Sequence, residues 1–419
     1  PGKGGHTGPT YIPPMLPGNM MSTLAITTNM PNTADLVVIG GGIVGAATAF
    51  FAARAGLRTV LLERRPALCT LTTPASTGAF RAQFDNPEEI ALVSESIHLF
   101  ENFADVTGLQ GYDLELRQQG YLWLTTSQEM AARQQALVAL QHEWGLTDVE
   151  YMDGDTARSR FPYLSPNILG ARYRARDGWL DVRRLTMGYA AASASTTFVI
   201  NTQAIGFDLD RGRVHGVHTS RGFISAGNVV IAAGPFSGEV ARLAGFELPL
   251  ALVRRQKLIM PDVPEVPPDA PMTIDEDTGA HWRPALRGAY LLRTSPGVPP
   301  GPPLDEVPTS SDFAFGLLDP SSDHSVARIS PFWRDVWARQ TSNWFLQAGQ
   351  YAYTPDHRPY LGPSPIPGLY LNCGYSGHGI MASGGGSRLV VDTIIGAVAP
   401  DANPFRFDRE FVYRDMDVL

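Results

Sequence analysis

The sequence has little lysine and little cysteine. Only Lys3 and Lys257 are lysines among the 33 basic residues, and 41 acidic residues bring the formal net charge to −8. No basic run is present that would follow a phosphate backbone, so we expect no binding to nucleic acid. Two cysteines, Cys69 and Cys373, are too few for a disulfide framework or a zinc site. This composition favours a cytoplasmic location.

Long hydrophobic runs are also missing. The longest apolar stretch, residues 39–53, is interrupted by four glycines and is shorter than the roughly 20 residues that a membrane span needs. We therefore expect no integral membrane segment. Hydrophobic residues make up 44% and charged residues 18% of the chain, which is typical of a globular protein. A length of 419 residues leaves room for two or three domains.

The first 33 residues are rich in Gly, Pro, Thr, Asn and Met and show no periodicity. We interpret residues 1–33 as a disordered leader or a tag remnant. From residue 35 the pattern predicts strand, Gly-rich turn, helix and strand, over 35–40, 43–55 and 58–63, which is half of a doubly wound sheet. Further along, helical spacing covers 88–107, 128–144 and 384–397, whereas short β-type runs fill 120–125 and 197–234.

A dinucleotide-binding fingerprint follows the first predicted strand. Gly40, Gly42 and Gly45 have the G-x-G-x-x-G spacing between a strand and a helix. Such glycines allow a tight turn, the approach of backbone amides to a pyrophosphate, and close packing of helix on strand. Glu63 ends the next strand, where a carboxylate accepts bonds from ribose hydroxyls and disfavours NADP. The expected cofactor contacts here include Ile43, Val44 and Arg64.

The C-terminal third carries a second pattern, TPD-x-x-P-x-x-G from residue 354 followed by GYSGHG at 374–379. Together with STGAFR at 76–81, DGWLD at 177–181, VVIAAGPFS at 229–237 and HWRP at 281–284, it resembles the FAD-dependent amino-acid oxidoreductases. That family is related to D-amino acid oxidase, glycine oxidase and sarcosine oxidase. The closest resemblance is to sarcosine oxidase and to the proline dehydrogenase β subunit, over about residues 35–400.

The resemblance implies an α/β FAD-binding domain of Rossmann type and an α+β substrate domain with a mixed β-sheet. We assign residues 34–84, 175–250 and 345–400 to the FAD-binding domain, 85–174 and 251–344 to the substrate domain, and 401–419 to a C-terminal tail. The glycine-rich loop near residue 376 suits the anionic edge of a reduced flavin, because its amides precede a helix N-terminus. The implied FAD contacts in these motifs are Ser76, Thr77, Gly78, Ala233, Gly234, Gly374, Gly377, His378, Gly379 and Ile380.

The sequence also departs from the resembling enzymes. Monomeric sarcosine oxidases bind flavin through a Cys six residues before the TPD proline, and Gly349 stands there. We therefore expect noncovalent FAD. Tyr351 matches a tyrosine that faces the substrate in those enzymes, whereas Met381 replaces their carboxylate-binding lysine. Arg81 is then our candidate for the substrate carboxylate, because a guanidinium binds it in bidentate fashion. His281 lies in a predicted strand and is a further candidate pocket residue.

The predicted reaction is oxidation of the C–N bond of a small or N-substituted amino acid, by hydride transfer to the flavin and hydrolysis of the imine. Oxygen, a quinone or a partner protein would accept the electrons. The shortage of lysine favours a dehydrogenase, because rapid reaction with oxygen in the sarcosine oxidases depends on a lysine. Two alternatives stay open: a flavoprotein acting on a hydroxy acid or polyol, and an FAD-holding electron-relay subunit of a homo- or hetero-oligomer. We expect no metal site.

Overall fold

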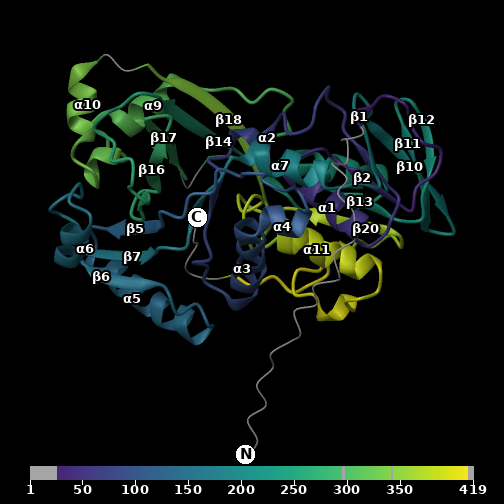
Figure 1. The fold of residues 1–419 in the computed structure, drawn as a ribbon, viewed down its shortest axis with the longest axis horizontal. Helices are drawn as coiled ribbons and strands as arrows, with labels where there is room; N and C mark the ends of the chain where they lie inside the picture. The colour runs from purple at the N-terminus through teal and green to yellow at the C-terminus, as the bar shows by residue number, and fades with distance from the viewer. Residues whose placement is uncertain (1–25, 295–297, 341–342, 414–419) are drawn as a thin grey trace, which may run out of the picture.

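The computed structural model describes residues 26–294, 298–340 and 343–413 and contains two large sheets that lie side by side (Figure 1). The first sheet has seven strands, parallel except for the last pair. In spatial order they are β1 (Ile26–Thr27), β9 (Thr196–Val199), β3 (Thr59–Leu62), β2 (Leu36–Ile39), β13 (Val229–Ile231), β20 (Leu369–Cys373) and β19 (Tyr360–Pro363).

Helices cover this first sheet. On one face α1, α3 and α11 share a hydrophobic core, to which Phe50, Leu92 and Val390 contribute. The other face packs under a three-stranded sheet of β10 (Ala204–Asp210), β11 (Arg213–Thr219) and β12 (Gly222–Ser225). The helices of this half are α1 (Ile43–Arg54), α2 (Thr72–Ala75), α3 (Pro87–Glu101), α4 (Phe103–Thr107), α7 (Val182–Ala191), α8 (Ser237–Leu243) and α11 (Ser383–Ile394).

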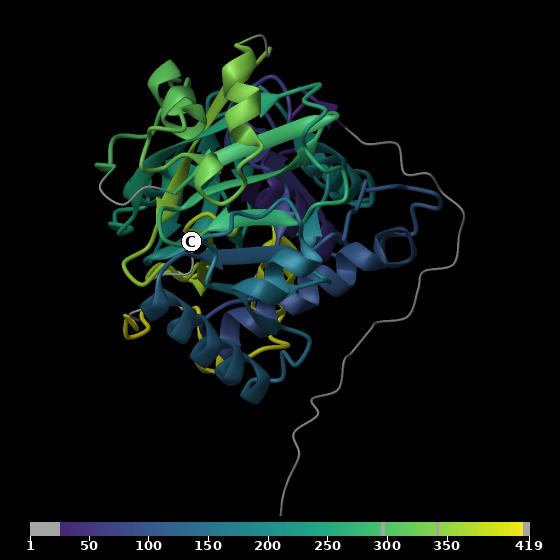
Figure 2. The same cartoon turned by 90° about the vertical axis from the view of Figure 1, so that its left-hand side faces the viewer.

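The second sheet has eight strands and is mixed, because β15 and β5 are parallel while the other neighbours are antiparallel. Its order is β18 (Phe345–Tyr353), β14 (Ala251–Met260), β17 (Gly288–Arg293), β16 (Ala280–Ala285), β15 (Met272–Asp275), β5 (Tyr121–Thr125), β7 (Gly170–Arg174) and β6 (Glu150–Asp153). Helices α9 (Ser311–Leu318) and α10 (Trp333–Arg339) lie near one end of the sheet, and α5 (Gln128–Glu143) and α6 (Gly154–Arg160) lie near the other (Figures 1 and 2). A short ribbon of β4 (Ala79–Phe80) and β8 (Gly178–Trp179) completes the strands.

This architecture confirms the predicted fold class, but four predicted boundaries are wrong. Residues 26–33 are not a loose leader: β1 pairs with β9, and Asn32 and Ala34 bond to Ser225. Residues 345–353 belong to the second sheet, because β18 pairs with β14 along nine residues. Helix α3 shares the core of α1 and α11, and its Ser96 hydroxyl accepts the amide of Gly385 in α11, so it belongs to the first half. Residues 1–25 lie outside the described residues.

The C-terminal segment is the fourth correction. Phe405 is buried, its carbonyl accepts the amide of Leu361, and Arg409 pairs with buried Asp356. The described part of 401–413 is therefore fastened to the first sheet. The predicted helix at 88–107 is also divided, because Asn102 leaves helical geometry between α3 and α4. Contacts between segments that are distant in the chain decide where these four segments pack, and local sequence patterns do not show such contacts.

Candidate functional site

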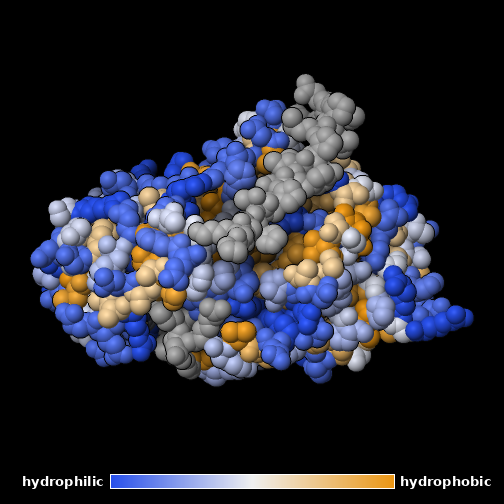
Figure 3. Space-filling model, turned by 90° about the horizontal axis from the view of Figure 1, so that it is seen from below, coloured by the Kyte–Doolittle hydropathy of each residue, from blue (hydrophilic) through white to orange (hydrophobic). Residues whose placement is uncertain are grey.

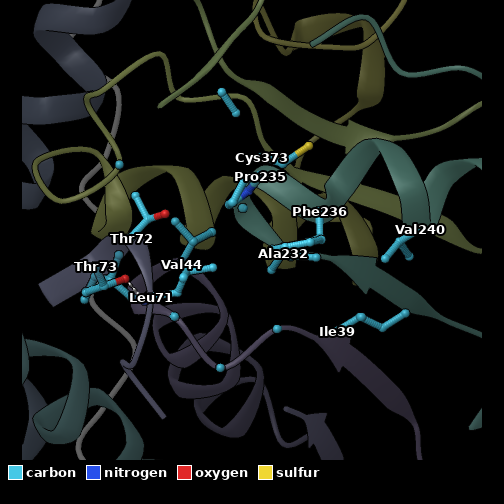
Figure 4. A pocket seen from close by; sticks show the side chains of 18 of the residues that line it. Ile39, Val44, Leu71, Thr72, Thr73, Ala232, Pro235, Phe236, Val240 and Cys373 are labelled. Carbon is cyan, nitrogen blue, oxygen red and sulfur yellow. Dashed lines mark hydrogen bonds between the residues drawn. The ribbon is translucent and has the colours of Figure 1, made fainter. Parts of the chain in front are cut away.

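A cavity runs along the carboxyl ends of four parallel strands of the first sheet, and we call it the cofactor cavity (Figure 4). Gly40 follows β2, Glu63 follows β3, Ala232 follows β13 and Gly374 follows β20, and all four residues line it. Ligands of open α/β sheets bind at this edge of the strands. In Figure 4, Val44 and Thr72 lie on one side of the cavity, and Phe236 and Val240 lie on the other.

The three fingerprint glycines differ in what surrounds them. Gly40 has φ +120°, and an added Cβ would lie 2.4 Å from the carbonyl oxygen of Ala232. A Cβ on Gly45 would lie 1.9 Å from the carbonyl oxygen of Gly40, so these two glycines are required by packing. At Gly42 a Cβ would meet only the Thr73 hydroxyl, at 3.2 Å. Gly42 is thus the glycine that keeps the cavity itself open.

The N-terminus of α1 fits the pyrophosphate of FAD. Gly42 is the N-cap and offers no side chain to the first-turn amides, although the Thr73 hydroxyl accepts the Ile43 amide at 3.2 Å. The remaining electropositive helix end faces the cavity, which is the usual arrangement for a bound phosphate. The residues at the N-terminus of α1 therefore fit FAD, the cofactor that the sequence predicts.

Glu63 lines the cavity at the carboxyl end of β3, where the sequence predicts the ribose. Its two carboxylate oxygens accept the amides of Gly41 and Arg65, each at 2.7 Å. Burial raises the pKa of Glu63, while these two bonds and the charges of Arg64 and Arg65 oppose the rise. A carboxylate has about four acceptor positions, so two are left for ribose hydroxyls.

A segment of the substrate half crosses to this end of the cavity, and we call residues 298–310 the strap. The amides of Gly301 and Leu304 bond to Leu252 and to the Gln350 side chain, at 2.9 and 2.8 Å. Beyond them Asp305 forms an ion pair with Arg64, and its carbonyl accepts Arg65 at 3.1 Å. The strap therefore links the second sheet to the loop after β3. Residues 295–297, which precede it, lie outside the described residues.

The strap should help to retain FAD. Asp305→Ala removes the ion pair with Arg64, so we expect FAD binding to weaken about 3- to 5-fold, because an exposed pair contributes at most about 1 kcal/mol. Titration of the apoprotein with FAD at low salt, followed by fluorescence, measures this. Glu306→Ala is the matched control on an exposed neighbour. Identical affinities of the two variants at low salt would show that the strap has no part in retention.

At its far end the cavity reaches the GYSGHG loop and Tyr351. Gly377 has φ +100°, and an added Cβ would lie 2.5 Å from the Tyr351 ring, so ring and loop are packed face to face. Ser376 has φ +51°, and its amide bonds to the carbonyl of Ala352 at 3.0 Å. At Gly349 an added Cβ would lie 3.1 Å from Ala75 and 3.3 Å from Thr72 of α2. Helix α2 therefore covers the position that a flavin-linked cysteine would occupy.

His378 and Arg81 meet in a buried cluster behind this loop. An Arg81 Nη2 to His378 Nε2 distance of 3.3 Å and a His378 Nδ1 to Glu89 Oε1 distance of 3.7 Å connect the three side chains. Burial alone would raise the pKa of Glu89, but His378, with Asn86 and Arg358, holds it below its usual value. Arg81 also donates to the carbonyl of Gln83 at 3.1 Å and is only 2% exposed. Neither the Arg81 nor the His378 side chain lines the cofactor cavity.

The other predicted site residues fall into two groups, those that line the cofactor cavity and those that do not. The predicted residues that line the cavity are Gly40, Gly42, Ile43, Val44, Glu63, Arg64, Ser76, Ala233, Gly234, Tyr351, Gly374, Gly377, Gly379 and Ile380. Gly45, Thr77, Gly78, His281 and Met381 do not line it, and Met381 is 6% exposed in the core with Tyr375. Sequence reasoning missed Thr72, Thr73, Gln203, Phe236 and Gln350. Thr72 and Thr73 lie in a polar run before residue 76, and Phe236 lies in the motif at 229–237, whereas Gln203 and Gln350 come from distant segments outside the quoted motifs.

One face of the second sheet carries Tyr351, which lines the far end of the cofactor cavity. Tyr351 pairs with Val253, Lys257 pairs with Leu292, and Leu292 pairs with His281, so these side chains share a face with Arg255. The Arg255 guanidinium donates to the Tyr353 hydroxyl at 3.0 Å and lies 5.9 Å from the centre of the Tyr351 ring. Arg255 was not predicted, and it brings a positive charge beside a cavity-lining tyrosine.

His281 is on this face and is neutral. Burial lowers its pKa to about 4, although its contact with the carbonyl of Gly279 opposes the shift and the charge of Arg255 adds to it. Its Nδ1 lies 2.9 Å from that carbonyl, so Nδ1 carries the proton and Nε2 is the basic atom. His281 and Arg283 do share a face, as strand alternation predicts.

Several of the sequence motifs have structural explanations. Asp177 is fully buried and accepts the amide of Ala82, the Gln83 amide group and Arg174. In the TPD motif the Thr354 hydroxyl donates to the carbonyl of Arg358 at 2.7 Å, and Asp356 binds Arg409. Cys373 is buried beside the cavity, and burial raises its pKa to about 12, so its thiol stays protonated.

Within the described residues, no cluster of His, Cys, Asp and Glu has a geometry that would bind a metal ion. No helix in these segments is both long enough and apolar enough to span a bilayer. Hydrophilic residues cover most of the face seen from below, and hydrophobic residues show in smaller areas (Figure 3).

Comparison with known proteins identifies the family. The family model DAO, described as FAD dependent oxidoreductase, matches residues 35–393. Mouse mitochondrial sarcosine dehydrogenase (Mus musculus) is 26% identical over 90% of this chain and 41% of its own length. Glycine oxidase from Pseudomonas putida is 27% identical over 87% of this chain and 95% of its own length. The crystal structure of L-proline dehydrogenase from P. horikoshii matches 90% of this chain and 99% of its own with a TM-score of 0.78 and 23% identity.

The solved structure shows a common fold, and the family match covers most of the chain. The chain spans about two fifths of the length of sarcosine dehydrogenase. Because that relative is named as mitochondrial, the cytoplasmic location stays a prediction. The fingerprint, the cavity at the strand ends and the family match agree that FAD is the cofactor. The chain belongs to the DAO family of FAD-dependent oxidoreductases.

Proposed function

We propose that this protein oxidises the C–N bond of a small or N-substituted amino acid and passes the electrons to an acceptor other than oxygen. The observation that carries the proposal is that Arg255 and His281 lie on the same sheet face as Tyr351, which lines the cofactor cavity. Relatives named as sarcosine dehydrogenase and glycine oxidase support the substrate class. FAD, held noncovalently because Gly349 offers no thiol, supplies the hydride acceptor.

Arg255 is the group that we assign to the substrate carboxylate, in place of Arg81. Its guanidinium lies beside the rings of Tyr351 and Tyr353, 5.9 and 5.6 Å from their centres. Such a planar cation can bind a carboxylate with two parallel hydrogen bonds. Arg81 instead directs its bonds to Gln83 and His378 behind the loop.

His281 complements this arrangement. A neutral imidazole adds no positive charge beside the substrate nitrogen, and its Nε2 can accept a hydrogen bond from that nitrogen, while the ammonium proton leaves to water. Hydride transfer needs the uncharged amine, since its nitrogen lone pair drives the loss of hydride. The Tyr351 ring, whose pKa burial raises to about 12, stays protonated and can donate a hydrogen bond to the substrate.

The test is the binding of a carboxylate substrate by matched arginine variants. We expect Arg255→Met to weaken binding of sarcosine or L-proline about 30-fold, the equivalent of a charged hydrogen bond of ~2 kcal/mol, while FAD is retained. Arg255→Lys should recover only part of this loss. Arg254→Met is the control, because Arg254 lies on the opposite face of β14 and donates to the carbonyl of Pro308.

Anaerobic bleaching of the flavin, titrated with each amine, gives both affinity and reactivity. A panel of amino acids, N-methyl amino acids and hydroxy acids identifies the donor class. Bleaching by hydroxy acids alone would overturn the proposed reaction. Equal affinities of the Arg254 and Arg255 variants would remove Arg255 from the substrate site.

A further inference from the structure

A second cavity of about 800 Å³ lies across the segment 74–77 from the cofactor cavity. Ser76 lines both cavities, and Pro74 and Thr77 line the second. The other walls come from strands β14, β16 and β17 and from the residues that begin α7. We propose that this second cavity binds the electron acceptor, and that the acceptor is a planar aromatic anion such as a quinone with an acidic substituent. This inference rests on the proposed function, which leaves the acceptor open.

The charge of the lining indicates an anion. The protein as a whole is acidic, with a net charge of −8, but five cations and only two acids line this cavity. Glu115 forms an ion pair with the Arg184 guanidinium at 2.8 Å. Asp181 accepts the backbone amide of Arg184 at 2.8 Å and keeps its charge, which partly offsets those of Lys257 and Arg283. The cations are Arg117, Arg183, Lys257, Arg283 and Arg287, of which Arg287 is paired with Asp262.

Two of the cations are buried and hydrogen-bonded to neutral groups. Lys257 is 4% exposed and donates to the carbonyls of Pro74 and Ser76, at 3.1 and 2.7 Å. Arg283 is 6% exposed and donates to the carbonyls of Thr77 and Pro284. In the described part of the chain, no carboxylate forms an ion pair with either side chain. A buried charge without a counterion is costly, so a bound anion would stabilise this wall.

The pKa values of Lys257 and Arg283 are lowered, as expected for buried cations without a counterion. Burial, followed by the nearby charge of Arg283, lowers the pKa of Lys257 to about 7. Burial likewise lowers the pKa of Arg283 to about 10. An anion in the cavity would raise both values, because it stabilises the charged forms.

Aromatic rings alternate with these cations. The Arg283 guanidinium lies 5.0 Å from the centre of the Trp179 ring and 4.6 Å from that of Tyr290, and the Lys257 Nζ lies 4.8 Å from Tyr290. Flat rings beside a planar guanidinium suit a ligand that is itself flat. A small inorganic anion would use the charges but not the rings, so we favour an aromatic acceptor.

The position also suits electron transfer. Lys257 bonds to the carbonyl of Ser76, and Ser76 itself lines the cofactor cavity, so only one backbone segment separates the two cavities. A quinone bound there would take up two electrons and two protons and leave as the hydroquinone. The electrons and one proton derive from the hydride that the amine has given up, and the second proton comes from water.

Binding of anthraquinone-2-sulfonate to the FAD-loaded protein tests the proposal without turnover. We expect saturable binding by calorimetry, with quenching of tryptophan fluorescence because Trp179 lines the cavity. Lys257→Met and Arg283→Gln should each weaken binding at least about tenfold, which is the loss of one charged contact of ~1.4 kcal/mol. Lys257→Arg should keep most of the affinity. Arg221→Ala, on an exposed turn of the three-stranded sheet, is the control.

The arms of the experiment separate the possible occupants. Sulfate should bind more weakly than the aromatic sulfonate, and sarcosine should not displace the sulfonate. Displacement by sarcosine would assign the cavity to the amine substrate and overturn the proposal, as would equal sulfonate affinity of the wild type and both charge variants. Melting temperatures show whether each variant is folded, and Lys257→Arg preserves the test if Lys257→Met is not. Flavin bleaching by amines fails or succeeds independently, so the two proposals can be distinguished.

Discussion

Gly42→Val should give a folded protein that does not bind FAD. The backbone at Gly42, with φ −79° and ψ −174°, accepts any residue, and the nearest atom to an added Cβ is the Thr73 hydroxyl at 3.2 Å. The branched side chain would instead fill the space before α1 in which the pyrophosphate is expected. We expect FAD affinity to fall by roughly 100-fold or more, about 2.7 kcal/mol, with little change in melting temperature of the apoprotein.

Two further glycine variants serve as controls for Gly42→Val. Gly45→Ala should prevent folding, because its Cβ would lie 1.9 Å from a backbone oxygen. Gly227→Val should behave as wild type, because nothing lies within 4 Å of the added Cβ on this exposed loop. The flavin absorbance of the purified proteins and their circular dichroism measure both properties. A yellow Gly42→Val protein with normal FAD content would exclude Gly42 from the cofactor site.

Arg81→Ala should lower the free energy of unfolding by about 3 kcal/mol, because it removes a buried side chain together with its hydrogen bonds. The guanidinium bonds to Gln83 and His378 and lies 4.4 Å from the centre of the Phe84 ring. Urea denaturation measures the change, and Arg221→Ala should stay within about 0.5 kcal/mol of wild type. Unchanged stability with much weaker substrate binding would restore Arg81 as the carboxylate ligand.

The fingerprint residues that the sequence predicts do lie at the cofactor cavity, because this part of the cavity is built from a local motif. Gly40, Gly42 and Gly45 lie within six residues, and the strand and helix beside them follow from hydrophobic patterning. Glu63 was predictable because parallel strands end at the same edge of the sheet. Two other predicted residues do not line the cavity: His378 of the glycine loop lies in a buried cluster, and Met381, just after the loop, lies in the core.

The sequence by itself determined the family, the cofactor and the existence of two sheets, because contiguous motifs carry them. Only the tertiary structure decided that β18 joins the second sheet, that Arg255 stands beside Tyr351, and that the strap reaches Arg64. It alone also set Lys257 beside Ser76, 181 residues away in the chain. Alternation along a strand defines two faces but not which face is turned to the cofactor. That choice depends on the register between distant strands, which is settled when the whole core packs.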